Sequence, residues 1–234
     1  MPPPAASPVV ALGIPGIALA LAVAFVAGWA RAGGRVLPAA AGVAAWLTLT
    51  AAIALSGVLA RFDVRPPTVL PFMLLVVGAA LGLGFSALGE RLARALPLAW
   101  LVGIQGFRLP LELVLHRAGR EGVMPVQMSF SGWNFDIVTG ITALALAPLI
   151  ASGRAPRALV VAWNALGLAL LAAIGIIAVA SVPALHAFGT APERLNTWVA
   201  YFPYVWLPAG PVAFALAGHV IVARRLARTP RVCL

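Results

Sequence analysis

The sequence from Gln105 to His116 reads Gln-Gly-Phe-Arg-Leu-Pro-Leu-Glu-Leu-Val-Leu-His and lies in an apolar segment long enough to cross a lipid bilayer. Its polar residues are separated by three, four and four positions; they are Gln105, Arg108, Glu112 and His116. In an α-helix these offsets place all four side chains on one stripe. An arginine near mid-membrane costs about 2.5–3.5 kcal/mol on insertion scales, so Arg108 needs a partner. Glu112, one turn away, is the nearest candidate.

The composition of the chain predicts an all-α, polytopic integral membrane protein. Hydrophobic residues make up 62% of the chain and charged residues 9%, and the mean hydropathy is +1.03. A soluble domain carries about 25% charged residues. The basic residues are all arginine and are dispersed between apolar segments, so we interpret them as topology signals and expect no nucleic-acid partner. The lack of lysine and the abundance of alanine, glycine, proline and arginine favour a bacterial source, and hence the inner (plasma) membrane.

Seven apolar runs, each about 17–25 residues long, match the roughly 30 Å of hydrocarbon that a transmembrane helix spans. They are Val9–Ala30, Val36–Ala60, Thr68–Gly89, Pro97–Leu115, Phe135–Ala151, Ala158–Val182 and Tyr201–Ala223. We therefore predict a seven-transmembrane-helix bundle over residues 9–226. A disordered tail (1–8) precedes this domain, and a basic cytoplasmic tail (227–234) follows it.

Arginines between the runs predict the orientation of the bundle. One side holds Arg31, Arg35, Arg91, Arg94, Arg154, Arg157, Arg224, Arg225, Arg228 and Arg231. The other side holds Arg61, Arg65, Arg117, Arg120 and Arg194. Because cytoplasmic loops are enriched in arginine, the N-terminus should lie outside and the C-terminus in the cytoplasm. The helix with Arg108 then runs outward, and His116 lies at its outer rim.

The segment after this helix adds two polar residues at the outer mouth of the bundle. Asn134 and Asp136 begin the fifth run. In one interpretation Asn134 is an N-cap, and Asp136 lies in the first helical turn, where the helix dipole favours an anion. In the other, Asp136 joins Glu112 and His116 across the mouth.

The seventh run is interrupted by Pro203, Pro208 and Pro211, and broken helices at membrane depth line cavities or are covered by protein. Tyr204 and Trp206 could form an aromatic wall facing the polar stripe. Two further polar residues, Asn164 and His219, are interpreted as structural. We expect His219 to lie near the cytoplasmic interface and Asn164 to hydrogen-bond between helices.

Several classes of chemistry are excluded or unsupported. The size and topology resemble a microbial rhodopsin, but the chain has no lysine for a Schiff base. The length also resembles that of seven-helix sugar transporters, without their Pro-Gln signature. No catalytic, phosphate-binding or paired-cysteine motif is present, and we predict no cofactor and no resident metal. The single cysteine, Cys233, cannot form an internal disulfide.

Three functions remain open. The first is a transporter or receptor-like binder of a small solute or ion, with a polar cavity opening outward around Arg108 and Glu112. The second is a membrane-embedded enzyme or metal-binding protein that uses Glu112, His116 and Asp136, or binds copper through His116 and two loop methionines, Met124 and Met128. The third is a non-catalytic assembly subunit whose charges hold helices together. The lipid bilayer is the one certain partner, and the oligomeric state is left open.

Overall fold

The computed structural model describes residues 5–228, and every regular element in that part of the chain is a helix, as the sequence predicts. The elements are α1 (Pro8–Arg31), α2 (Val36–Leu55), η1 (Val58–Ala60), α3 (Val69–Phe85), α4 (Ala87–Ala95), α5 (Leu98–Gly103), η2 (Ile104–Phe107), α6 (Arg108–Arg120), η3 (Val126–Met128), α7 (Ile137–Ala151), α8 (Arg157–Ala180), η4 (Pro192–Arg194), η5 (Trp198–Ala200), η6 (Pro208–Val212) and α9 (Ala213–Arg228). The η segments are short 3₁₀ turns, except η6, which is a π-helix.

Five helical segments are long and apolar enough to cross a membrane: α1, α2, Leu98–Arg120, α8 and Pro208–Arg228. The pair α3 and α4 makes a sixth if it is counted as one span, with a bend of 54° between its halves. These are the helices of a multi-pass membrane protein. The predicted seven-span count is not settled by helix length, because α7 has only 15 residues.

Ser86 and Gly89 explain the bend between α3 and α4. The hydroxyl of Ser86 accepts hydrogen bonds from the N–H groups of Leu88 (3.1 Å) and Gly89 (3.2 Å), which caps α4 and starts a new helix. A Cβ atom at Gly89 would lie 2.3 Å from the carbonyl oxygen of Gly84. Only a residue without a side chain permits this turn.

The two predicted tails lie largely outside the described residues. Residues 1–4 and 229–234 are not described, so Arg231 and Cys233 have no structural account. Of the predicted N-terminal tail, Pro8 is already the first residue of α1. Of the predicted basic tail, Arg228 ends α9.

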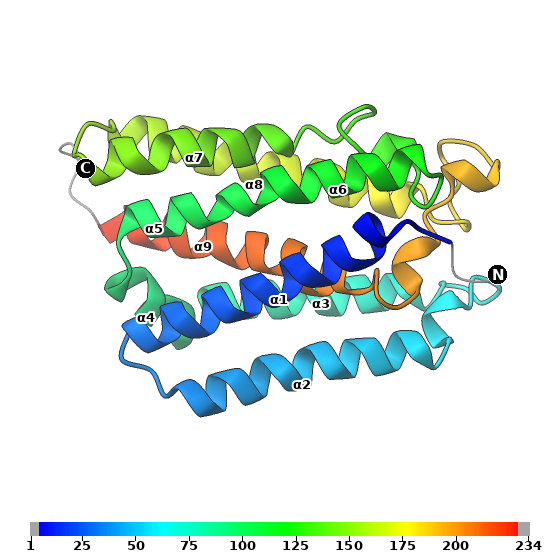
Figure 1. Ribbon diagram of the computed structural model, residues 1–234, viewed down its shortest axis with the longest axis horizontal. Coiled ribbons are helices and arrows are strands. Elements are labelled where there is room, and N and C mark those ends of the chain that lie inside the picture. The colour runs from blue at the N-terminus through cyan, green and yellow to red at the C-terminus, as the bar shows by residue number, and fades with distance from the viewer. Residues whose placement is uncertain (1–4, 229–234) are drawn as a thin grey trace.

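The helices run side by side, with α2 along one edge of the bundle and α7 and α8 along the opposite edge (Figure 1). Helix α9 lies between these edges and contacts α3, α4, α5 and α8. Its buried residues, which include Ala217, Val220 and Val222, point in several directions around the helix axis, as in a helix surrounded by protein.

One end of the bundle gathers most of the arginines. The last turns of α1 and α9, helix α4 and the loop between α7 and α8 all lie at this arginine-rich end, and the N-terminus lies at the opposite end (Figure 1). Glu90 of α4 is its central acid. The carboxylate lies 2.6 Å from a nitrogen of Arg94 and 2.6 Å from one of Arg224, and it also pairs with Arg228. These contacts fasten α4 to α9.

Candidate functional site

The span from Leu98 to Arg120 is not a continuous α-helix. Helix α5 ends at Gly103, the 3₁₀ turn η2 follows, and α6 begins at Arg108. Pro110 therefore falls in the first turn of α6, where proline is tolerated best. A Cβ atom at Gly106 would lie 2.4 Å from a methyl group of Leu144, so the break packs closely against α7.

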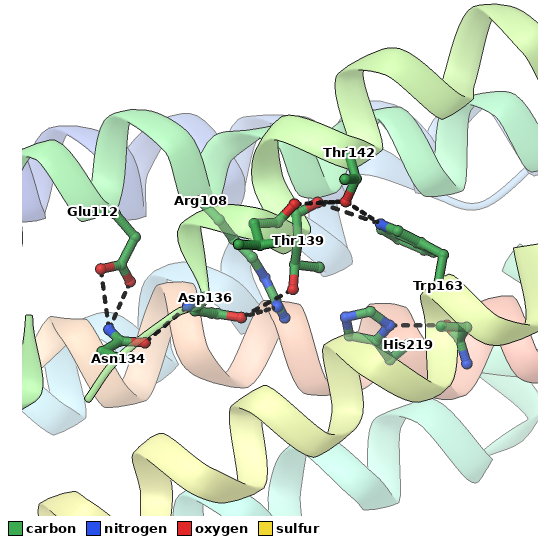
Figure 2. Close-up of polar contacts among 10 residues, drawn as sticks. Arg108, Glu112, Asn134, Asp136, Thr139, Thr142, Trp163 and His219 are labelled. Atoms are coloured by element: carbon green, nitrogen blue, oxygen red, sulfur yellow. Dashed lines mark hydrogen bonds and ion pairs between the residues drawn. The ribbon is translucent and has the colours of Figure 1, made fainter. Parts of the chain in front are cut away.

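Arg108 forms its ion pair with Asp136 and not with Glu112. Nη1 of Arg108 lies 2.6 Å from Oδ1 of Asp136, and both side chains are buried. Figure 2 marks this contact with a dashed line. Asp136 is the residue before α7, and it also accepts a hydrogen bond of 3.3 Å from the hydroxyl of Thr139. The cost of burying an arginine correctly predicted that Arg108 needs an acid, but Glu112, the candidate from the helical offset, is not that acid. The partner comes from the segment before α7.

Gly140 allows α6 and α7 to approach closely enough for this pair. A Cβ atom there would lie 2.7 Å from the backbone nitrogen of Leu109 and 3.1 Å from Cβ of Arg108. Any side chain at position 140 would push the two helices apart. The glycine thus lies next to the charge pair because the backbone of α7 must reach α6 there.

Glu112 accepts hydrogen bonds from an amide and has no basic partner. Nδ2 of Asn134 lies 2.9 Å and 3.0 Å from the two carboxylate oxygens, and it also donates to the carbonyl oxygen of Met128 at 3.1 Å. Oδ1 of Asn134 in turn accepts the N–H of Asp136 (Figure 2). Glu112 is only 2% exposed, and no arginine or histidine among the described residues lies within ion-pairing distance of it.

A loop that folds back into the bundle brings Asn134 to Glu112. Glu112 lies eight residues, or about 12 Å, from the end of α6 at Arg120, so the following segment must return inward by that depth. Gln127 anchors the segment, since its Nε2 donates to Ser181 Oγ (3.1 Å) and to the carbonyl oxygen of Arg194 (2.8 Å). Met128, Ser129, Asn134 and Asp136 of this segment are all buried.

The polar contacts continue from Asp136 through Thr139 and Thr142 to Trp163 (Figure 2). Trp163 of α8 donates through Nε1 to Thr142 Oγ1 at 3.1 Å and to the carbonyl oxygen of Thr139 at 3.3 Å. The ring of Trp163 packs on that of His219, with centroids 5.2 Å apart. Nδ1 of His219 lies 2.8 Å from Oδ1 of Asn164. An amide oxygen can only accept, so Nδ1 donates and Nε2 is left as an acceptor.

His219 is fully buried within the protein, and its predicted depth near the membrane interface stays a prediction. Asn164 does hydrogen-bond between helices, as predicted. Three buried side chains of this region keep polar atoms without a hydrogen-bond partner among the described residues. They are both amide atoms of Gln105, Nε and Nη2 of Arg108, and Nε2 of His219. Buried polar atoms are ordinarily paired with protein or ordered water.

The remaining predicted site residues lie apart from this network. His116 stacks on Phe130, with ring centroids 4.4 Å apart, and its Nδ1 lies 2.9 Å from Ser131 Oγ. Tyr204 packs on Trp198 in an apolar cluster. Trp206 donates to the carbonyl oxygen of Leu47 in α2 at 3.0 Å, so it is directed toward α2.

The metal-binding alternative finds no support in the part of the chain that the structure describes. Glu112, His116 and Asp136 do not form a group that could hold a metal ion, and no other such group of histidine, cysteine and acidic residues occurs between residues 5 and 228. The two loop methionines, Met124 and Met128, are buried in an apolar cluster. Their thioethers fill the core, which is the common role of methionine.

Comparison with models of protein families, with curated proteins and with solved structures finds no match to this chain.

Proposed function

We propose that the protein is a seven-span membrane transporter or receptor-like binder of a small solute or ion, in which Glu112 exchanges a proton. The seventh span in this proposal is α7, which starts below the membrane surface because the preceding loop folds inward. The arginine-rich end faces the cytoplasm and the N-terminus lies outside, in agreement with the positive-inside rule. A bacterial inner membrane is the proposed location.

The observation that carries the proposal is the charge balance around Glu112. Arg108 and Asp136 neutralise one another, whereas Glu112 is buried against an amide alone. An ionised carboxylate in an apolar interior without a cation is costly, and such groups become neutral instead. Glu112 therefore holds a proton in this closed conformation. It releases that proton when water or a ligand reaches it.

The loop from Glu121 to Phe135 is the proposed gate. Arg108 and Glu112 are 1% and 2% exposed, so the conformation described here is closed over them. Asn134 belongs to the loop, and its outward movement would open Glu112 to the outer side. A ligand that binds the open form better than the closed form shifts this equilibrium and couples its own binding to the proton.

Infrared spectroscopy of the protein in liposomes tests the proton on Glu112. The parent should show the band of a protonated carboxylic acid at about pH 7, and the band should be absent from Glu112→Gln. The control is Glu193→Gln, which changes an exposed glutamate and should keep the band. A parent without the band, or a Glu112→Gln variant that keeps it, contradicts the proposal.

Proton-coupled transport is tested in proteoliposomes that contain a pH-sensitive dye. A panel of small organic and inorganic ions is added outside, and the change in internal pH is recorded for each. At least one ion should change the internal pH through the parent and through Glu193→Gln, but not through Glu112→Gln. Equal responses of the parent and Glu112→Gln would show that this acid does not carry the proton.

A further inference from the structure

The first half of α2 stands away from the rest of the bundle. The buried residues of this helix, Leu47, Thr50 and Ala54, all belong to its second half. Between the first half and helices α1, α3, α4 and α9 lies a cavity of about 500 Å³. A Cβ atom at Gly42 in this half would have nothing within 4 Å, and Gly42 lines the cavity.

Two tryptophans hold α2 at the middle of the bundle. Trp46 donates through Nε1 to the carbonyl oxygen of Ala209 at 2.8 Å, and Trp206 donates to that of Leu47 at 3.0 Å. These bonds join α2 to η6 and to the residues just before it. The separation between α2 and the bundle is therefore confined to the part of α2 nearer the arginine-rich end (Figure 1).

The depth of the cavity matches one leaflet of a bilayer. Its wall on α1 extends from Ala18 to Trp29, which corresponds to about 16 Å of helix. The hydrocarbon of a bilayer is about 30 Å thick, so one leaflet contributes about 15 Å. No charged or hydroxyl-bearing side chain lines the cavity. A hydrocarbon chain is the occupant that fits this lining.

Arginines flank the end of the cavity that Trp29 and Pro38 line. Arg31 follows Trp29 by two residues, Arg35 precedes the lining residue Pro38, and both are exposed. Neither forms an ion pair with a described residue. Arg91 lies over the ring of Trp29, 4.9 Å from its centroid. Glu90, the acid of this end, is already occupied by three other arginines.

We propose that this cavity binds an acyl chain of an anionic phospholipid from the leaflet on the arginine-rich side, with the lipid phosphate between Arg31 and Arg35. The apolar walls take the chain, and the two unpaired guanidinium groups take the phosphate. This lipid site is independent of proton exchange at Glu112, since the lining of the cavity includes none of the ionisable residues near Glu112.

Native mass spectrometry of the full chain in detergent tests the site with two probes of equal acyl length, phosphatidylglycerol and phosphatidylcholine. The parent should retain phosphatidylglycerol about tenfold better. Gly42→Phe fills the cavity and should lower this retention about fivefold. Gly78→Phe is the matched control, because a Cβ atom there also meets nothing within 4 Å but Gly78 does not line the cavity.

The head-group contact is tested by Arg35→Gln, which should reduce the preference for phosphatidylglycerol while retention of phosphatidylcholine stays unchanged. Arg154→Gln changes another exposed arginine at the same end and should leave the preference intact. Equal retention of the two lipids by the parent overturns the proposal, as does an equal loss in Gly42→Phe and Gly78→Phe. Melting temperatures of all variants identify those that do not fold, and Arg35→Gln still decides the head-group contact if Gly42→Phe is among them.

Discussion

Arg108, the first residue of α6, and Asp136, the residue before α7, form a buried ion pair of 2.6 Å between positions 28 residues apart. The loop between them must fold inward before the pair can form. The guanidinium is 1% exposed and the carboxylate side chain 8%, so each charge depends on the other for compensation. Neither charge can therefore be buried unless the start of α7 lies close to α6.

We expect Asp136→Asn to destabilise the protein by about 3–5 kcal/mol, because it leaves the Arg108 guanidinium buried without a counter-charge. Unfolding in mixed micelles measures this free energy. Asp63→Asn is the control, since the side chain of Asp63 is 73% exposed. The double variant Arg108→Met, Asp136→Leu should recover much of the loss. A cost for Asp136→Asn no larger than that of the control would contradict the role of the pair.

Gly140→Ala should cost about 1–3 kcal/mol, because the added Cβ atom would meet the backbone of Leu109 at 2.7 Å. Gly175→Ala in α8 is the matched control, since a Cβ atom there meets nothing within 4 Å. That change should be neutral or stabilising, as alanine is the better helix former. Equal unfolding free energies for the two variants would mean that α7 can move away from α6 without loss.

The stability that the contact between Ser7 and Glu121, here called the N-terminal anchor, gives to the fold should depend on pH. Glu121 accepts the backbone N–H of Ser7 at 2.9 Å and also pairs with Arg117, and the Ser7 bond contributes most to lowering the pKa of Glu121 to about 2. Because the folded pKa lies below the ordinary value of 4.5, this contribution to stability is complete above about pH 4.5. It is lost as the pH falls from there toward about 2.

Melting temperatures of the parent and Glu121→Gln measure this dependence. The parent should be the more stable at neutral pH, and the difference should shrink as the pH falls through that window. Glu193→Gln provides the reference for an exposed glutamate outside the anchor. A difference between parent and Glu121→Gln that stays constant down to about pH 2 would show that the ionised carboxylate does not contribute.

Glu90→Gln should loosen α4 from α9. The variant leaves Arg94, Arg224 and Arg228 close together without their shared acid, so the three like charges repel. Amide hydrogen exchange over Ala87–Ala95 should become faster, while exchange in α8 stays the same. Unchanged protection of α4 would show that the helix is held by its apolar contacts alone.

The helical fold could be predicted from the sequence because of its long apolar runs. The buried charges could be predicted because Arg108 and Glu112 lie inside one of these runs, where charged residues are rare. The same sequence patterns could not identify which acid pairs with Arg108. Asp136 lies at the start of a helix, where a local N-terminal role and a distant ion pair have the same sequence pattern. The fold of the intervening loop decides between them.

His219 illustrates a second limit of sequence reasoning. The seventh apolar run ends at Ala223, which places His219 near a membrane surface. Helix α9 continues to Arg228, and His219, nine residues before that end, is fully buried among side chains of other helices. Gln105, Asn164 and His219 come from three separate segments of the chain. Their mutual arrangement follows from the packing of α9 at the centre of the bundle, which no local pattern records.

The loop that supplies Asn134 makes the surroundings of Glu112 depend on the position of a connecting segment. The hydrogen-bond donor to the Glu112 carboxylate belongs to the connection between α6 and α7 and not to a helix of the bundle. In the proposed function, displacing this connection would remove that donor and open to water an acid that lies about 12 Å from the end of α6. A movement of this loop would thereby change the charge of the Glu112 side chain inside the protein.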